Sequence, residues 1–312
     1  MRIVLPGALP DPREARELAP YLQKSAPTLH GWFSASHAQI LPADPDTAGC
    51  TAYEQWLLAD RGFRPNHEQS LAAGLGPLLA RGPVQAQQAT WLVELVHVAP
   101  SRDGAALLPA RDLDITAEQS VALFESVQEL FAGSGFTLYP SDDQHWRIDL
   151  PAEFSPTCAS PDMVSTTSVN DWWPQDMAAR PWRRLVNEVQ MHWFEHPINR
   201  SREEQGLPPI NSLWLFGGAR ADQFSDLSSR PDDVLENGLS APALRQDWNG
   251  WLAALAELEQ RVFKPLEPGR APELVLTGRS RIVQLRPSAL KHYTQWLPAS
   301  RLSWRRWWSP QD

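Results

Sequence analysis

Residues 187–218 read NEVQMHWFEHPINRSREEQGLPPINSLWLFGG, and they indicate the fold class. The stretch begins inside a helix predicted over 181–195, because apolar residues recur there every three or four positions. These apolar residues are Trp182, Leu185, Val186, Val189 and Trp193. After a short turn closed by Gly206, the apolar run at 211–216 predicts a buried strand. A helix followed closely by a buried strand is typical of an α/β protein.

The stretch also contains His192-Trp193-Phe194-Glu195-His196, an H-x-x-E-H string that can mark a zinc peptidase helix. Two histidines at this spacing share one helix face, and Glu195 could act as a base. The alternative is an incidental spacing, which we favour because Pro197 follows at once and no third ligand is evident. His196 would then lie on the last helical turn, where the helix dipole favours a histidine.

Polar side chains cluster at the predicted helix end, turn and strand end. They are Asn187, Glu188, His196, Asn199, Arg202 and Asn211. Such ends are where α/β proteins place ligand groups, but Asn and Ser are also common caps and turn formers, as in the capping-box spacing Ser201-x-x-Glu204. We expect the three amides and Arg202 to bond one another or the backbone at 215–218, with Asn187 facing a neighbouring loop. Phosphate-ester binding by Arg202 is the alternative.

Gly217-Gly218 follows the predicted strand. Two glycines in this position could present backbone N–H groups to a phosphate, or they could form a plain turn. We expect the turn.

Composition narrows the function classes. The 312-residue chain is long enough for a large core with an insertion, and a net charge of −9 argues against nucleic acid or an anionic membrane as the main partner. Two cysteines, Cys50 and Cys158, are too few for a disulfide framework or a structural zinc cluster. We expect no signal peptide, and no run approaches the roughly twenty apolar residues of a membrane span. A cytoplasmic protein is therefore expected.

The rest of the chain alternates short helices and strands. Segment 88–155 predicts a compact unit with a strand at 91–98, a helix that begins at a capping box of Thr116 and Gln119, and strands at 136–139 and 145–150. Further elements are predicted as helices at 13–24, 52–60, 68–81 and 248–263 and as a strand at 273–277. The tail WRRWW at 304–308 could stack bases, but at this net charge we expect its Trp rings to dock on the core.

The stretch 187–218 resembles the archaeal-type, cofactor-independent phosphoglycerate mutases, which carry V-N-E, H-P-x-N and N-x-x-W-L-x-G-x-G strings in the same order. It is even more similar to a bacterial family of phosphoglycerate-mutase-like, or pathogenicity-factor-type, regulatory proteins. That family shares the N-E-V-Q-M and H-P-x-N strings and ends in a W-R-R-W-like tail. Elsewhere, APTLH at 26–30 resembles the mutases' T-P-N-L-D, and RGPVQA at 81–86 their R-G-P-x-E-A. The resemblance implies a mutase-like scaffold rather than a zinc site.

The same resemblance implies residues that this chain lacks. In the mutases the first strand ends in a metal-binding Asp, where this chain has Pro6, with Asp11 the nearest carboxylate. The mutases hold the nucleophile in a Ser-Asp pair. The corresponding segment of this chain, 44–53, has no such pair, and only Thr47 and Thr51 offer aliphatic hydroxyls there. The mutases supply further His and Asp metal ligands late in the chain, but His292 is the sole histidine after residue 218. Two-metal phosphoryl transfer needs several converging ligands and an activated nucleophile.

We therefore expect an alkaline-phosphatase-like α/β core, degenerate at its metal-site strands, formed by 1–87 and 161–312 with a smaller α/β domain inserted at 88–160. The expected function is non-catalytic binding or regulation by a mutase-like protein. The expected site residues, binding or structural, are Asn187, Glu188, His196, Asn199, Arg202, Asn211, Gly217 and Gly218.

The expected partner is a small phosphorylated metabolite or a protein, not nucleic acid or a membrane, and no cofactor is expected. The alternative is an active metal-dependent phosphomutase or phosphatase with relocated ligands, which would need Mn or Zn.

Overall fold

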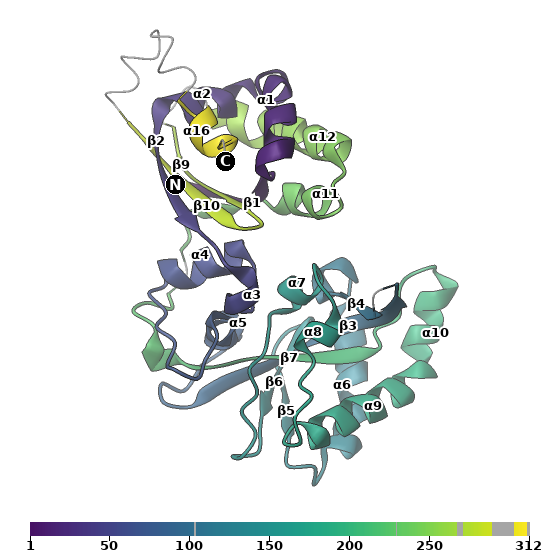
Figure 1. Ribbon diagram of the computed structural model, residues 1–312. Helices are drawn as coiled ribbons and strands as arrows, with labels where there is room; N and C mark the ends of the chain where they lie inside the picture. Colours follow the sequence, from purple (N-terminus) through teal and green to yellow (C-terminus); the bar gives the residue numbers. More distant parts are fainter. Residues whose placement is uncertain (103, 229, 267–270, 289–302, 311–312) are drawn as a thin grey trace. The chain divides into compact units, whose positions relative to one another are not determined.

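The computed structural model describes residues 1–312 apart from 103, 229, 267–270, 289–302 and 311–312. The chain folds into two compact units, each with its own sheet (Figure 1). The first unit combines Met1–Pro45 with Ser228–Asp312, and the second is the continuous segment Asp46–Leu227. The protein is a mixed α/β protein, which confirms the predicted fold class.

The unit boundaries differ from those we predicted. We expected an inserted domain at 88–160, but its first strand, β3 (Ala89–Ser101), pairs with β7 (Ser212–Arg220) from Ala89 to Val96. These backbone hydrogen bonds join 88–160 to a later part of the chain in one sheet. The segment that separates the two halves of the first unit therefore runs from Asp46 to Leu227.

The sheet of the first unit has the strand order β2-β10-β9-β1-β8. Its strand β1 (Arg2–Leu9) is parallel to β8 (Asp233–Leu235) and β9 (Glu273–Gly278). Strand β10 (Arg281–Pro287) is antiparallel to β9 and to β2 (Ser36–Pro42). Most of β1 is buried, as expected for a parallel strand in the middle of a sheet.

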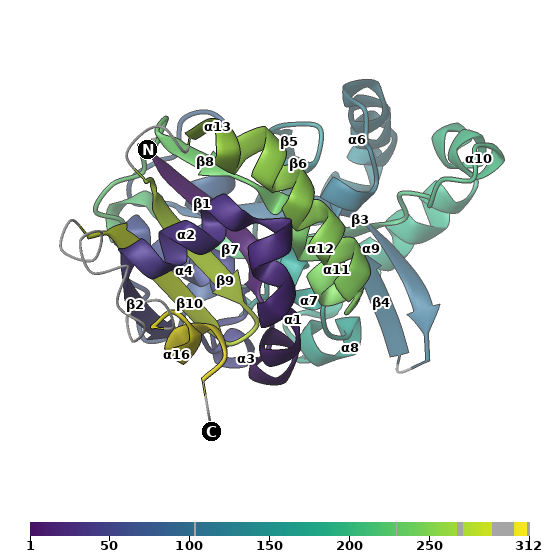
Figure 2. The same ribbon diagram turned by 90° about the horizontal axis from the view of Figure 1, so that it is seen from above.

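Helices gather against this sheet (Figure 2). The helical elements of the first unit are α1 (Pro12–Ser25), α2 (Pro27–Ala35), the 3-10 turn η4 (Asn237–Leu239), α11 (Ser240–Leu244), α12 (Trp248–Leu258), the π-helix η5 (Glu259–Phe263), α13 (Lys264–Leu266) and α16 (Arg305–Trp308). The C-terminal tail docks on the core, as predicted: Trp304, Trp307 and Trp308 are buried there. Arg281 holds the tail by donating hydrogen bonds to the carbonyls of Trp307 and Trp308 at 3.0 and 2.8 Å.

The sheet of the second unit is antiparallel and centred on β3. Strand β3 pairs with β7, with β6 (His145–Asp149) and, over its last residues, with β4 (Gly104–Leu108), and β5 (Thr137–Pro140) pairs with β6. Between Pro45 and Gln223 the described helical elements are α3 (Pro45–Ala48), α4 (Ala52–Asp60), η1 (Leu71–Gly74), α5 (Leu75–Leu79), η2 (Ala110–Asp112), α6 (Ala117–Phe131), α7 (Pro161–Val164), α8 (Val169–Trp172), α9 (Arg180–Phe194), α10 (Pro197–Glu204) and η3 (Ala221–Gln223). The capping box of Thr116 and Gln119 and the buried apolar stripe of α9 are both confirmed.

The junction between α9 and α10 differs from the prediction. Helix α9 ends at Phe194, and His196 is the N-cap of a second helix rather than part of the last turn of the first. Pro197 occupies the first position of α10, where its missing N–H costs nothing, so it starts a helix. Ser201 lies inside α10, and the capping box predicted there is wrong.

Gly217 and Gly218 lie within β7, not in a turn, at φ values of +101° and +106°. A Cβ atom on Gly217 would lie 2.8 Å from the Thr90 carbonyl oxygen, and one on Gly218 would lie 2.5 Å from the Trp91 ring. Glycine is therefore required by the backbone conformation and by close packing. Among the helices of the described ranges, none combines the length and apolar character needed to cross a bilayer.

Candidate functional site

Asn199 lies in α10 and is 1% exposed. Its Nδ2 donates to the carbonyl oxygens of Trp193 and Ile210 at 2.9 and 2.8 Å, and its Oδ1 accepts from the Ile210 N–H at 2.8 Å. The side chain thus joins the end of α9 to the start of β7. Because these groups are buried, the amide satisfies backbone positions that water does not reach.

Arg202, one turn further along α10, is also 1% exposed. Its guanidinium donates to the Pro208 carbonyl at 2.9 Å, to Gln119 Oε1 at 2.9 Å, and to the Leu113 carbonyl. Burial lowers the pKa of this group from its usual range, although the charge of Asp114 opposes that effect. All three guanidinium nitrogens are directed into the fold, where they join α10 to Leu113 before α6, to Gln119 in the first turn of α6 and to Pro208 after α10.

Asn211 precedes β7 and extends its ladder. The Val98 N–H donates to Asn211 Oδ1 at 2.8 Å, and Asn211 Nδ2 donates to the Val98 carbonyl at 2.9 Å. The carboxamide therefore takes the place of one more peptide unit beside β3. We expected Asn199, Arg202 and Asn211 to bond one another or the backbone at 215–218. The observed partners are other backbone groups and, for Arg202, also the Gln119 side chain.

Asn187, Glu188 and His196 lie nearer the surface. Asn187 is exposed on α9, so the expectation that it faces a neighbouring loop is wrong. Glu188 accepts a hydrogen bond from Arg184 at 2.8 Å on the same helix. The Nδ1 atom of His196 accepts from the Ile198 N–H at 3.3 Å, and burial, reinforced by the charge of His192, lowers the pKa of His196. A neutral ring suits this capping bond.

His192→Ala is expected to change the free energy of unfolding by less than about 0.5 kcal/mol, because His192 is an exposed side chain of α9. Chemical denaturation of both proteins measures the difference. The metal content of the purified proteins should also be the same, and a matched loss of bound zinc in the variant would contradict an incidental H-x-x-E-H spacing.

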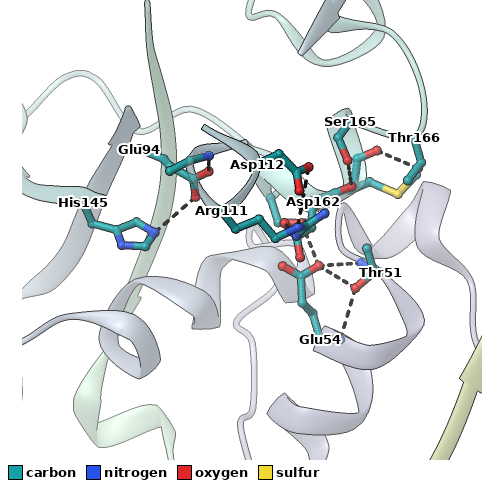
Figure 3. Close-up of polar contacts among 12 residues, drawn as sticks. Thr51, Glu54, Glu94, Arg111, Asp112, His145, Asp162, Ser165 and Thr166 are labelled. Carbon is teal, nitrogen blue, oxygen red and sulfur yellow. Dashed lines mark hydrogen bonds and ion pairs between the residues drawn. The ribbon is translucent and has the colours of Figure 1, made fainter. Parts of the chain in front are cut away.

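A second polar group of side chains lies around Glu54, the third residue of α4 (Figure 3). Glu54 Oε2 accepts from the Thr51 N–H at 2.7 Å, the Thr51 hydroxyl at 2.9 Å and the Ser160 hydroxyl at 2.7 Å. Thr51 and Ser160 are the N-caps of α4 and α7, so one carboxylate ties two helix starts together. Burial raises the pKa of Glu54 and outweighs these hydrogen bonds.

Arg111 lies among carboxylates beside this group (Figure 3). Its guanidinium pairs with Asp162 and lies 3.9 Å from Asp112, and its charge also favours ionised Glu54. This one cation offsets part of the repulsion among the three acids.

His145 joins two strands of the second sheet. Its Nε2 lies 3.1 Å from Glu94 Oε2 on β3, and its Nδ1 lies 3.1 Å from Asp142 Oδ1 in the β5–β6 loop. Burial opposes protonation, but the hydrogen bonds and charges of Asp142 and Glu94 outweigh it and raise the pKa of His145 to about 9. With both ring nitrogens engaged, His145 acts as a cationic clamp.

Neither the Glu54 group nor the His145 clamp was predicted from the sequence. The spacing Thr51-x-x-Glu54 is a capping-box signal and could have identified the first part of the Glu54 group. For the His145 clamp, the alternation of β3 and β6 predicts strands but not their register, which sets Glu94 opposite His145.

Pro6 and Gly7, within β1, are packed by backbone and side chains of the first unit. The Pro6 carbonyl accepts from the Ser240 hydroxyl at 3.1 Å, and the Gly7 carbonyl accepts from Trp251 Nε1 at 2.9 Å. Gly7 has φ +75°, and a Cβ atom there would lie 2.7 Å from Ser240 Cα and 2.8 Å from the Leu239 carbonyl oxygen. Pro6, the residue before Gly7, is the position at which the resemblance implies a metal-binding Asp in the mutases.

The remaining candidate ligands do not complete a metal site. Within the part of the chain that the structure describes, no three His, Cys, Asp or Glu side chains come together in a way that could hold a metal ion. Asp11 is exposed at the start of α1, and His292 lies outside the described residues. The described residues therefore do not fit the Mn or Zn centre that the resemblance implies.

The sequence of this α/β chain is similar to those of two known proteins from one class of enzymes. It is 26% identical over 139 residues to a probable 2,3-bisphosphoglycerate-independent phosphoglycerate mutase of Geobacter sulfurreducens, covering 44% of this chain and 35% of that protein. It is 26% identical over 103 residues to a 2,3-bisphosphoglycerate-independent phosphoglycerate mutase of Methanothrix thermoacetophila, covering 33% and 26%. The chain thus spans about a third of the first relative and about a quarter of the second. No protein-family model matches it.

Two solved structures align with most of the chain. The PH0037 protein from Pyrococcus horikoshii has a TM-score of 0.49 at 14% identity, covering 92% of this chain and 87% of its own. The cofactor-independent phosphoglycerate mutase from Thermoplasma acidophilum has a TM-score of 0.34 at 12% identity, covering 92% and 90%. TM-scores this low carry no argument about function. By its sequence, the chain is a distant relative of the cofactor-independent phosphoglycerate mutases, which confirms the predicted resemblance.

Proposed function

We propose that this mutase-like protein is a non-catalytic binding or regulatory protein that works without a metal cofactor. Its ligand on this proposal is a small phosphorylated metabolite or another protein.

The packing around Pro6 and Gly7 of β1 carries the proposal. Pro6 has no ligating side chain, and the carbonyls of Pro6 and Gly7 are bonded to Ser240 and Trp251. The next residue, Gly7, leaves no room for a side chain either, because a Cβ atom there would lie 2.7 Å from Ser240 Cα. Metal catalysis depends on the first ligands of the ion, so loss of this position supports a function other than phosphoryl transfer.

The Thr51 hydroxyl adds a second line of support. It donates to Glu54 at 2.9 Å and accepts from the Glu54 N–H at 3.3 Å, so it serves as the cap of α4. A nucleophilic hydroxyl needs a base that removes its proton and space for an incoming phosphate. Glu54, the nearest acceptor, is itself shared with the Thr51 N–H and with Ser160.

The experiment is a paired assay on the purified chain, with an active cofactor-independent phosphoglycerate mutase as positive control. We expect substoichiometric Mn and Zn, and no conversion of 3-phosphoglycerate to 2-phosphoglycerate and no release of phosphate with either metal added. Stoichiometric metal together with turnover would contradict the proposal and support the alternative of relocated ligands. Thermal unfolding with millimolar 3-phosphoglycerate then separates the two ligand classes, because only a phosphorylated-metabolite site predicts a raised melting temperature.

A further inference from the structure

The outer face of α9 carries an exposed stripe whose one side-chain contact described above is the hydrogen bond from Arg184 to Glu188 on the same helix. Its residues recur at alternating spacings of four and three, which keeps them on one line of a helix. They are Arg180, Arg184, Asn187, Met191 and Phe194. The stripe lies opposite the buried face formed by Trp182, Leu185, Val186, Val189 and Trp193. We call these five exposed residues the α9 stripe.

Two residues of the α9 stripe are large and apolar. Met191 and Phe194 are 76% and 79% exposed, although they follow one another along the last turn of a helix whose other face is fully packed. An isolated exposed apolar residue needs no explanation, but two adjacent ones in line on a helix resemble the contact seam of a helix pair.

Charge is distributed unevenly along the same helix. The N-terminal half carries Arg180, Arg183 and Arg184, and the Arg184 side chain is 83% exposed. The C-terminal half carries Glu188 and Glu195 beside Met191 and Phe194. An antiparallel second copy of this helix would therefore place its basic half against the acidic and apolar half, which is favourable, whereas a parallel copy would set like charges side by side.

We propose that α9 pairs with α9 of a second copy of this chain, antiparallel and centred on Asn187. In this register Asn187 faces its own counterpart, where two amides can hydrogen-bond each other. Arg184 lies over Met191 of the other copy, between Glu188 and Glu195, and Arg180 lies over the Phe194 ring, a geometry that allows a cation–π contact. A polar residue at the centre of a helix–helix seam can specify register, which gives Asn187 a function that its exposed position in one chain lacks.

The pairing must be weak. A helix of 15 residues is about 22 Å long, so the seam alone falls in the size class of transient interfaces. We expect a dissociation constant on the order of micromolar, with dimers visible only at high protein concentration.

Sedimentation velocity over a concentration series tests the pairing. The wild-type chain should shift from monomer to dimer as concentration rises, and Phe194→Glu should raise the dissociation constant by about tenfold or more. The matched control is Tyr21→Glu, which places the same charge on a 52% exposed aromatic residue of α1 and should leave the dimer unchanged. Both sites are on the surface, so circular dichroism should show folded variants. A wild-type monomer at all concentrations, or a dimer that tolerates Phe194→Glu, would overturn the proposal.

Cross-linking tests the orientation. Asn187→Cys should form a disulfide-linked dimer on oxidation, because the two Asn187 positions face each other. Arg180→Cys should not, because its two copies would lie about 21 Å apart along the helix axis, beyond the reach of a disulfide. The native Cys50 and Cys158 are buried and serve as the background. Equal cross-linking at both positions would exclude the antiparallel register.

Discussion

Asn199→Ala is expected to destabilise the second unit by about 3–5 kcal/mol. The change removes three hydrogen bonds, two to the Trp193 and Ile210 carbonyls and one from the Ile210 N–H, in a place that is 1% exposed. Each buried polar group left without a partner costs about 1–3 kcal/mol. Urea unfolding followed by tryptophan fluorescence measures the loss, and faster amide exchange of the segment 193–211 would locate it.

Asn187→Ala is the matched control for Asn199→Ala. It makes the same substitution in the same stretch of sequence, but at an exposed position of α9, so the expected change is within about 0.5 kcal/mol. Equal stability of Asn199→Ala and the wild type would mean that the amide does not connect α9 to β7. The comparison also separates the structural use of Asn199 from the pairing that we infer for Asn187.

The sequence predicts local elements well where the pattern is long. Helices α6 and α9 lie within a residue or two of the predicted bounds, because each repeats apolar residues over four turns and α6 has a capping box. Strands β2 (SHAQILP) and β4 (GAALL) were not predicted. Both are edge strands, and β2 is largely exposed, so neither shows the continuous apolar run of a buried strand or a clear alternation.

The division of the chain could not be predicted for a different reason. Strand β7 comes directly after a helix and a turn, and this local pattern is visible in the sequence. Its partner β3, however, lies more than a hundred residues earlier. Periodicity shows which residues are buried and not which strand covers them. The resemblance to a family with an inserted domain placed the first boundary near 88, whereas the β3–β7 ladder moves it to Asp46.

The polar stretch 187–218 shows why a site residue and a structural residue are hard to tell apart by type. Asn199, Arg202 and Asn211 have the side chains that bind phosphates in other proteins, yet each completes backbone hydrogen bonds at a helix or strand end. The same donor that satisfies a phosphate oxygen satisfies a buried carbonyl. Only the position of the neighbouring carbonyls, which follows from the tertiary fold, decides between them.

His145→Gln is expected to remove a pH-dependent part of the stability of the second unit. In the wild type the pKa of His145 is raised to about 9 by Asp142 and Glu94 despite burial, whereas an unfolded histidine titrates near its ordinary value of about 6.5. The folded state thus holds the proton more tightly. Its contribution, on the order of 3 kcal/mol, is fully present below pH ~6.5 and is lost as the pH rises to about 9.

Denaturation of the wild type and His145→Gln at several pH values between 6 and 10 measures this contribution. The difference in free energy of unfolding between them should be largest at the acidic end and should shrink by on the order of 3 kcal/mol toward the alkaline end. His192→Gln makes the same change at an exposed position without the two carboxylates. The free energy of unfolding of this variant should therefore depend on pH as that of the wild type does. A constant difference across the range would show that His145 stabilises the β3–β6 pairing by packing against Phe216 and not by its charge, since the two rings lie 5.9 Å apart.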